Sequence, residues 1–472
     1  MTRDPRRLVP LAAILSFAAA LALFWPGIAE YDSVLQYAQA LSGRYDDWHP
    51  PVMARLWSVL IATVGPGTGP MLILQLGGYV IGLALIAAAL LRDGRPRAAL
   101  AVAAIGWWPP FLGWQGVVLK DAQAVAAMVA ALGLVGWYRL GGRAVPWPAR
   151  CAVATILLYA LLVRANAVFA IAPLIAGLAV TAGPVRRVGI AVAIVAATLA
   201  LSPAINHHLL RATGSGVEKT QPFYDLAGIA TRTGTTATGF TATGFTAAEA
   251  RGLVAHRCVT PFFWDRLGDA PGCGPATVRM WRQPAGALYR QLALAAATHP
   301  VAYLSHRLAH LNSTDRWWVP AHWPGAAPPG GSEPNDLGLA EPRSAATEWE
   351  RLAGWLAGTP AGWPVVWIAV AIVALAAGWR IAGPGAGIAR ALLASALALE
   401  ASFAVISIAS DLRYHLWPMI ATALALALLG RMPWRGHWRI ALIAVLAGVI
   451  AIGGIARIVL PSPPQSYADW MA

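Results

Sequence analysis

Charged residues are scarce in this chain. Asp, Glu, Lys and Arg make up 12% of its 472 residues, whereas hydrophobic residues make up 58%. Soluble globular proteins carry about a quarter charged residues, so the composition excludes an ordinary soluble domain. Apolar runs of roughly 20 residues, the length that crosses a bilayer, recur along the chain. The sequence therefore predicts an all-α polytopic membrane protein.

Acidic residues are scarcer still, 21 against 35 basic ones, which gives a net charge of +14. A basic protein can bind nucleic acid, but here the arginines lie in short loops between apolar runs. That distribution sets membrane topology, because basic loops stay in the cytoplasm, and we expect no nucleic-acid partner. The loops assigned to the cytoplasm are 92–97, 139–150, 183–187, the arginines at 380 and 390, and 431–439.

About eleven membrane helices of about 17–25 residues place all these loops on one side. The pattern leaves open whether 151–182 is one long span or two short ones. Segment 52–64 is too short to span and is expected to lie in the outer interface. The run 8–25 lacks a small-residue cleavage site after it, so we expect an uncleaved helix. The expected spans are 8–25, 69–91, 98–113, 121–138, 149–164, 167–183, 188–206, 362–380, 391–409, 414–430 and 439–459.

This topology predicts a cytoplasmic N-terminus and an extracytoplasmic C-terminus. Arginine far exceeds lysine and alanine is abundant, as in proteins of GC-rich bacteria, so the expected location is a bacterial inner membrane. The predicted divisions are a transmembrane module 1–205 with a first outer loop 26–68, an extracytoplasmic segment 206–361, C-terminal transmembrane helices 362–459 and an outer tail 460–472.

Cysteine is almost absent, with three residues in the whole chain. Cys258 and Cys273 both fall in the outer segment, where an oxidising environment permits a disulfide, while Cys151 opens a helix. We expect Cys258 and Cys273 to pair. The alternative is two unpaired thiols.

Polar residues gather where predicted helices end on the outer side. Charges near the hydrocarbon are costly and usually pair with one another or line a cavity. Paired interfacial charges are the simpler alternative, but clusters that recur at one membrane level favour a cavity that opens outward. The clusters are "EYDSVLQYAQALSGRYDDWHPPV" (30–52), "LKDAQ" (119–123), "VRANAV" (163–168) and "SDLRYHLWP" (410–418).

The residue types in these clusters suit group transfer from a lipid phosphate. Asp32 can take a proton from an acceptor hydroxyl, with Gln36 one helical turn away to orient that acceptor. Lys120, Arg164 and Arg413 can hold a phosphate and stabilise it as a leaving group. The chain has no glycine-rich phosphate-binding loop, which disfavours nucleotide-driven chemistry.

An aspartate just after the first helix, then a glycine and "HPP", resembles the first outer loop of GT-C glycosyltransferases. The similarity is to the protein mannosyltransferases and lipid A aminoarabinose transferases of glycosyltransferase family 39. It implies a GT-C-like fold and transfer of a sugar from a polyprenyl-phosphate carrier to a glycan, lipid or protein hydroxyl. The matching residues are Asp32, Gly43, His49, Pro50 and Pro51, with Asp121, preceded by Lys120, as a second aspartate at the outer start of a later helix.

One departure from that family concerns the base. The family's Asp-Glu pair reads Asp32-Ser33 here, with Glu30 on the other side, so Glu30 is an alternative base and Asp47 is a third. A transporter or flippase for an anionic lipid-linked glycan is the rival function, and a polytopic acyltransferase comes third. No cofactor is firmly implied, and a divalent metal is left open. The expected site residues are Asp32 as catalytic base and Gln36, His49, Lys120, Asp121, Arg164, Asn166, Arg413 and Tyr414 for substrate binding.

Other polar residues fall outside these clusters. Glu400 lies within a predicted span, where we expect a structural role, either protonated or paired with an arginine. His306 and His310 recur at i, i+4 spacing, which suits a metal, but no third ligand is evident. A polar helix face that includes Arg307 and touches the membrane or the cavity is the preferred interpretation.

Overall fold

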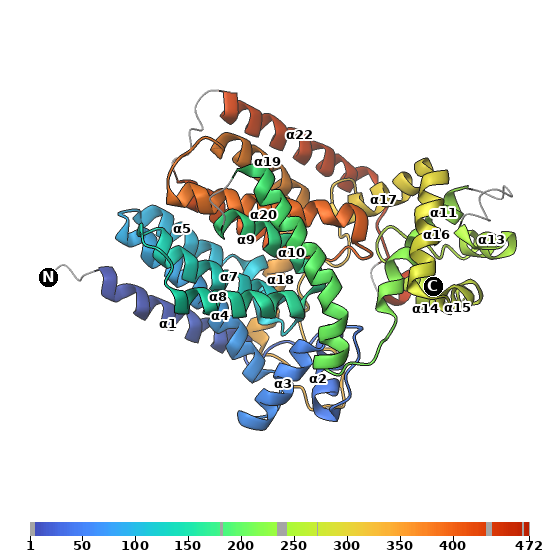
Figure 1. Ribbon diagram of the computed structural model, residues 1–472, viewed down its shortest axis with the longest axis horizontal. Helices are drawn as coiled ribbons and strands as arrows, with labels where there is room; N and C mark the ends of the chain where they lie inside the picture. Colours follow the sequence, from blue (N-terminus) through green and yellow to red (C-terminus); the bar gives the residue numbers. More distant parts are fainter. Residues whose placement is uncertain are drawn as a thin grey trace.

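The computed structural model describes residues 5–179, 183–233, 243–270, 272–430, 437–464 and 467–471. Over these ranges the chain is helical, and its extended pairings are isolated bridges. A bundle of apolar helices forms most of the molecule, and a smaller group of helices, α11 and α13 to α17, lies at one end, on the right in Figure 1. The expected all-α polytopic fold class is confirmed.

Within the described ranges, six helices are long and apolar enough to cross a membrane. They account for expected spans in both halves of the chain. These helices are α4 (Gly69–Arg92), α7 (Lys120–Arg139), α10 (Pro184–Ala204) with its continuation η2 (Ile205–Leu209), α20 (Pro384–Ile406), η5 (Leu412–His415) with α21 (Leu416–Leu429), and α22 (His437–Val459).

Shorter apolar helices complete the bundle. The described part of the ambiguous stretch, 151–179, forms two helices, α8 and α9, joined at Arg164 and the turn η1. Segment 52–64 forms a single short helix, α3, as expected. The shorter helices are α1 (Pro5–Phe24), α3 (Val52–Thr63), α5 (Pro96–Gly106), α8 (Trp147–Val163), η1 (Ala165–Ala167), α9 (Val168–Ala179) and α19 (Pro364–Gly378).

The expected span 98–113 is wrong as a single helix. The structure breaks it into α5, which ends at Gly106, and α6 (Pro109–Gly116). Trp108 precedes a proline and has ψ of 120°, outside the helical region. Proline disfavours helical backbone in the residue before it, so Pro109 and Pro110 end one helix and begin another.

The centre of the bundle is the contact between α4 and α7. Gly82 and Gly133 let the two backbones touch, since a Cβ on Gly82 would lie 2.4 Å from the carbonyl oxygen of Val129. Small residues at such crossings give close packing between membrane helices. Almost every residue in the first half of α7 is buried, so the N-terminal end of α7 is held firmly inside the molecule.

The outer helices have a hydrophobic core of their own, which includes Phe223, Leu226, Leu253 and Leu288. Cys258 and Cys273 lie in this core and are joined by a disulfide. The helices are α11 (Thr220–Thr233), preceded by η3 (Val217–Lys219), α13 (Ala247–Ala255), α14 (Asp265–Asp269), α15 (Gly274–Trp281), α16 (Ala285–Thr298) and α17 (Pro300–Asp315).

The part of segment 206–361 that follows α17 packs against the bundle instead. Trp317 Nε1 donates a hydrogen bond to the carbonyl oxygen of Val449 in α22 at 3.2 Å. Helix α18 (Ser344–Gly358), followed by η4 (Pro360–Gly362), packs against α6 and α1. The remaining helices are α2 (Tyr31–Ser42), in the first outer loop, and α23 (Tyr467–Met471), near the C-terminus.

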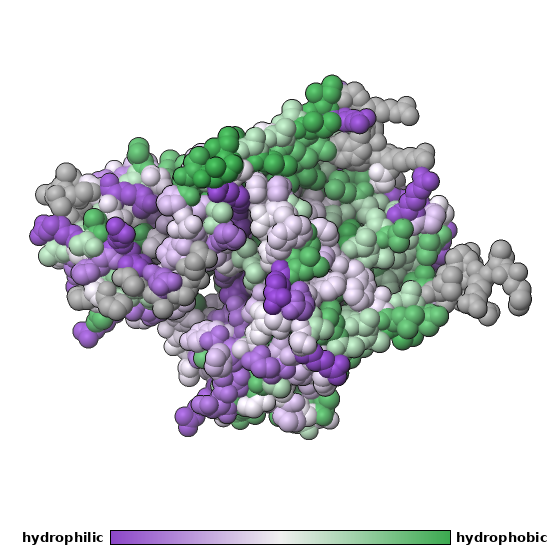
Figure 2. Space-filling model, turned by 180° about the vertical axis from the view of Figure 1, so that it is seen from behind, coloured by the Kyte–Doolittle hydropathy of each residue, from purple (hydrophilic) through white to green (hydrophobic). Residues whose placement is uncertain are grey.

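Surface hydropathy follows this division. Figure 2, the view from behind, shows hydrophobic surface over much of the bundle and polar surface gathered toward the end that carries the outer helices. Many large apolar side chains of α10 and α22 are exposed, among them Val185, Val192, Ile443 and Ile458. Helices exposed in this way suit contact with lipid.

Candidate active site

The first outer loop is fastened to the segment just before α7. Two backbone hydrogen bonds of 3.1 and 2.9 Å join Ile28 to segment 116–118. Ser33 Oγ donates to the carbonyl oxygen at the end of that segment at 2.5 Å. Because α2 and α7 both begin within a few residues of this junction, their first turns lie side by side. Asp32 and Lys120 therefore meet although 88 residues separate them.

Asp32 lies at the centre of a cluster of charged and polar side chains, which we call the cavity cluster: Asp32, His49, Lys120 and Arg413. Lys120 Nζ is 2.5 Å from Asp32 Oδ2, and Arg413 Nη2 is 3.5 Å from the same oxygen. His49 Nε2 lies 3.3 Å from Asp32 Oδ1. The Asp32 side chain is 13% exposed, so the carboxylate is sheltered but accessible.

His49 bridges the lysine and the aspartate. Its Nδ1 is 2.8 Å from Lys120 Nζ, so Nδ1 accepts from the ammonium group and Nε2 carries the ring proton toward Asp32. Burial and the charge of Lys120 lower the pKa of His49. The imidazole is consequently neutral at pH 7.

The two acidic residues of this region titrate differently. Burial alone would raise the pKa of Asp32, but the charges of Lys120 and Arg413 outweigh it and hold that pKa well below its usual range. Burial raises the pKa of Glu30 to about 7, and Arg413, which pairs with Glu30, offsets this only in part. At neutral pH Asp32 is ionised, and Glu30 is close to half-protonated.

A second pair of charges lies beside the cavity cluster. Arg164 Nε is 3.0 Å from Asp121 Oδ1. The guanidinium groups of Arg164 and Arg413 approach the Tyr414 ring, at 4.5 and 5.5 Å from its centroid. Such cation–π contacts fix the orientation of both arginines without using all of their hydrogen-bond donors.

Several of these side chains line a cavity of about 290 Å³. Its size is near the lower end of the range for small-molecule sites, about 300–1,000 Å³. Trp48 and Trp264 contribute an aromatic wall, with ring centroids 5.8 Å apart. The expected site residues among its lining are His49, Lys120, Arg164, Asn166 and Tyr414.

Three more expected residues lie one contact behind this lining. Asp32 contacts Lys120 and His49, Asp121 contacts Arg164, and Arg413 contacts Asp32. In the lining and directly behind it, several polar atoms are shielded from solvent and have no hydrogen-bond partner in the described part of the chain. These atoms are His49 Nε2, Asp121 Oδ2 and Arg413 Nε.

Gln36 does not line the cavity. It is buried in α2, one turn after Asp32, and its Nε2 has no hydrogen-bond partner among the described residues. The expected role in orienting an acceptor therefore rests on the helical register alone.

The cavity wall also includes residues that no sequence pattern marks as functional. Thr220 and Trp264 come from the outer helices, and Phe403 and Ser407 come from the end of α20 and the residues after it. Asp411, which lies within a selected cluster, pairs with Arg413 at 3.2 Å. The sequence pattern that could indicate a wall residue was a cluster of polar residues near a helix end. Asp411 lies in such a cluster, and Trp264 does not.

Asp47, the third candidate base, is occupied elsewhere. Its Oδ1 accepts hydrogen bonds from the backbone N–H and the hydroxyl of Ser215, at 2.6 and 2.7 Å. His207 Nε2 lies 2.8 Å from Oδ2. Asp47 thus joins the first outer loop to the segment after α10, and it does not line the cavity.

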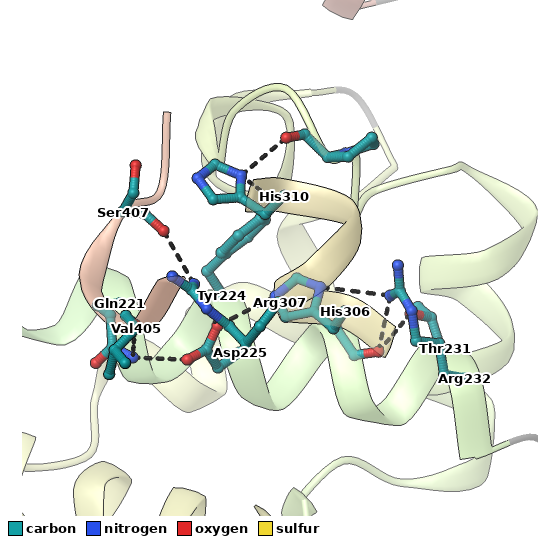
Figure 3. Close-up of polar contacts among 12 residues, drawn as sticks. Gln221, Tyr224, Asp225, Thr231, Arg232, His306, Arg307, His310, Val405 and Ser407 are labelled. Atoms are coloured by element: carbon teal, nitrogen blue, oxygen red, sulfur yellow. Dashed lines mark hydrogen bonds and ion pairs between the residues drawn. The ribbon is translucent and has the colours of Figure 1, made fainter. Parts of the chain in front are cut away.

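His306 and Arg307 belong to a second buried cluster, which we call the outer cluster and which consists of Asp225, His306 and Arg307. Figure 3 shows Asp225 of α11 facing both side chains of α17. Asp225 Oδ1 is 3.0 Å from Arg307 Nη1 and 3.1 Å from His306 Nε2. His310 Nδ1 lies 2.8 Å from the carbonyl oxygen of Pro261. The histidines form a polar network with these partners. The face is buried inside the molecule and none of its three residues lines the cavity, so the expected contact with the membrane or the cavity is not seen.

Arg307 also caps the C-terminal end of α20. Its guanidinium group donates to the carbonyl oxygens of Phe403, Ala404 and Ser407, each at 2.9 Å. Because Phe403 and Ser407 line the cavity, the outer cluster holds the cavity wall in place.

Glu400 has a histidine as its partner. His415 Nδ1 lies 2.8 Å from Glu400 Oε2, and no arginine pairs with this carboxylate among the described residues. Of the two alternatives expected for Glu400, pairing with an arginine is therefore wrong. Asp315, Glu400 and His415 are the group of side chains in the described ranges that could hold a metal ion.

Neither a family model nor a curated protein matches this chain. Among solved structures, the crystal structure of ArnT from Cupriavidus metallidurans bound to undecaprenyl phosphate is similar, with 16% sequence identity over 90% of this chain and 77% of that chain. The TM-score is 0.29. A similarity this low assigns no activity to this chain.

Proposed function

We propose that this protein is an integral membrane glycosyltransferase. It transfers a sugar from a polyprenyl-phosphate-linked donor to a hydroxyl group of a glycan, lipid or protein acceptor on the extracytoplasmic face. The observation that supports this most is the cavity cluster. The ionised carboxylate of Asp32 contacts Lys120 and His49, which line the cavity, and Arg413, which lies directly behind the lining.

The positively charged side chains of the site would bind the phosphate of the donor. Lys120 and Arg164 line the cavity, and Arg413 lies directly behind it. Their donors suit the oxygens of a lipid phosphate, which carries negative charge before transfer and more of it as a leaving group. The exposed apolar surface of the helix bundle would hold the prenyl chain in the bilayer.

Asp32 would act as the general base. Its carboxylate removes the proton from the acceptor hydroxyl, whose oxygen forms a bond to the anomeric carbon. The bond between that carbon and the phosphate oxygen breaks, and polyprenyl phosphate leaves with the electron pair.

In the free protein, Asp32 is a weak base, because Lys120 and Arg413 hold its pKa low. A donor phosphate would compete with Asp32 for these cations and would place a negative charge nearby. Both effects raise the pKa of a carboxylate. Donor binding would therefore activate the base, and a site without donor would not deprotonate an acceptor.

The proposed orientation has the N-terminus in the cytoplasm, the C-terminus outside and the cavity open to the outer face of a bacterial inner membrane. It follows from the arginine-rich loops. Reporter fusions after Arg187 and after Gly214 should report opposite sides of the membrane. Reports of the same side would contradict this orientation.

The decisive experiment uses the purified full-length protein in lipid nanodiscs with radiolabelled polyprenyl-phosphate sugars. The proposal predicts release of polyprenyl phosphate and label in a glycan, lipid or protein product. Glu348→Gln is a control, since its side chain is 65% exposed and lies far along the chain from the cavity residues. Movement of intact labelled lipid across liposomes, with the sugar–phosphate bond uncut, would replace the transferase with a transporter.

A further inference from the structure

Three side chains with metal-binding atoms converge beside the turn that carries Arg413 and Tyr414. Asp315 ends α17, Glu400 lies in α20, and His415 ends η5. Each offers one ligand atom, and these atoms all lie within 4.8 Å of one another. His415 and Glu400 are 0% and 5% exposed.

In the described ranges, no positively charged side chain neutralises the two carboxylates of this group. Neither Asp315 nor Glu400 forms an ion pair with a lysine or arginine in the described ranges. Arg316, the next residue, instead directs its guanidinium group at the carbonyl oxygens of Trp323, Pro324 and Ser410. Two sheltered carboxylates this close require either a proton or a cation between them.

Asp315 has spare capacity for a ligand. Its Oδ1 is shielded from solvent and has no hydrogen-bond partner in the part of the chain that the structure describes. An acceptor left unpaired in a sheltered place costs about 1–3 kcal/mol. The other two side chains contact each other, with His415 Nδ1 at 3.0 and 2.8 Å from the two oxygens of Glu400.

We propose that Asp315, Glu400 and His415 bind a divalent transition-metal ion of the Zn²⁺ or Mn²⁺ type. One imidazole nitrogen and two carboxylate oxygens suit these ions, and three protein ligands leave a position for water. Metal–ligand bonds of about 2.0–2.2 Å would require these ligand atoms to move together by roughly 1 Å. A dication also neutralises both carboxylates.

The site would position residues of the cavity without touching substrate. His415 is in the same turn as Arg413 and Tyr414. Its ring packs against Phe403, which lines the cavity, with centroids 5.0 Å apart. A metal ion would fix this turn to α17 and α20 together. Metal binding is separate from the proposed transfer reaction, and its test does not depend on activity.

The test measures the metal content and the thermal unfolding of the purified full-length protein in nanodiscs. After dialysis against metal-free buffer and addition of Zn²⁺ or Mn²⁺, the wild type should hold about one ion per chain, and the ion should raise its Tm. Glu400→Gln and His415→Gln should lose both effects. Glu350→Gln should keep both, because Glu350 is a buried carboxylate on α18 outside the group.

The wild type alone can overturn the proposal, even if the variants fail to fold. A wild-type protein that binds neither ion in stoichiometric amount, and whose Tm neither ion changes, contradicts it. The group would then share protons. Equal binding by the wild type and by a folded Glu400→Gln variant also contradicts the proposal, because the ion would occupy another site.

Discussion

The cavity cluster and the outer cluster contain the same kinds of side chain and differ in how their hydrogen-bonding capacity is used. In the outer cluster, Arg307 donates to Asp225 and to three backbone carbonyl oxygens. In the cavity cluster, Arg413 forms ion pairs with carboxylates and a cation–π contact with Tyr414, and its Nε has no partner among the described residues. The first arrangement fixes backbone, and the second leaves donors for a ligand.

Solvent access separates the two clusters in the same way. The Asp225 side chain is 0% exposed, and the Asp32 side chain is 13% exposed. A fully buried and hydrogen-bonded aspartate cannot reach a substrate. An Asp–His–Arg grouping therefore indicates a reactive site only where a cavity and unused polar atoms accompany it.

The largest effect on turnover is expected for Asp32→Asn. This change keeps size and hydrogen bonding but removes the proton acceptor, and loss of a general base commonly lowers a rate by about 10²–10⁴-fold. Single-turnover transfer with saturating donor measures it. Donor binding should survive or strengthen, because the donor phosphate no longer competes with a carboxylate for Lys120 and Arg413. Near-normal transfer by Asp32→Asn beside an inactive Glu30→Gln variant would move the base to Glu30.

The matched change in the outer cluster, Asp225→Asn, should affect stability. It leaves Arg307 without its carboxylate partner, and breaking a buried ion pair costs about 3–5 kcal/mol. Thermal unfolding in detergent measures the loss. Glu348→Gln, whose partner Arg351 is also exposed, should cost less than about 1 kcal/mol. If Asp225→Asn unfolds like the wild type but loses transfer, the two clusters do not differ as described.

The polar residues around the cavity could be predicted from the sequence, but the contacts between their side chains could not. Asp32, Lys120, Arg164 and Arg413 were selected because each lies at a helix end on one predicted side, and the structure does bring them together. The direct 2.5 Å contact of Lys120 with Asp32 was not foreseen, because it depends on the backbone pairing between residue 28 and segment 116–118.

Other features of the site could not be predicted from the sequence, because they also depend on contacts between distant segments of the chain. Trp264 reaches the cavity from the outer helices through long-range packing, and no local pattern marks it. His415 and Glu400 are 15 residues apart and meet only because the chain turns back between α20 and α21. The break in the expected span 98–113, by contrast, was readable from Pro109 and Pro110.

Neutralising the cations should weaken donor binding. Lys120→Met and Arg164→Met each remove a charged partner from the cavity lining, and such truncations cost about 2–5 kcal/mol of affinity. Equilibrium binding of a radiolabelled polyprenyl-phosphate sugar measures the loss. Arg351→Gln is the control, with a side chain 68% exposed on α18. Unchanged affinity in both lining variants would remove the support for phosphate binding there.

A smaller effect is expected for the disulfide of the outer helices. Replacing Cys258 and Cys273 by serine opens a loop of sequence separation 15, and closure of such a loop contributes about 3 kcal/mol. Thermal unfolding should show a lower Tm for the double variant, and Cys151→Ser, at an exposed free cysteine, should not. Alkylation of Cys258 and Cys273, in addition to the free Cys151, in the unreduced wild type would show that the bond does not form.

The pH dependence of kcat/KM tests most directly whether Asp32 is the base, since it reports ionisations of the free protein. The pKa of Asp32 lies well below its usual range, and that of Glu30 is about 7. A base with a low pKa stays ionised as pH falls. If Asp32 is the base, kcat/KM should therefore stay level from about pH 8 down to about pH 6. A decline to about half at pH 7 and to about one-tenth at pH 6 would show that a group like Glu30 takes the proton, and would contradict the account.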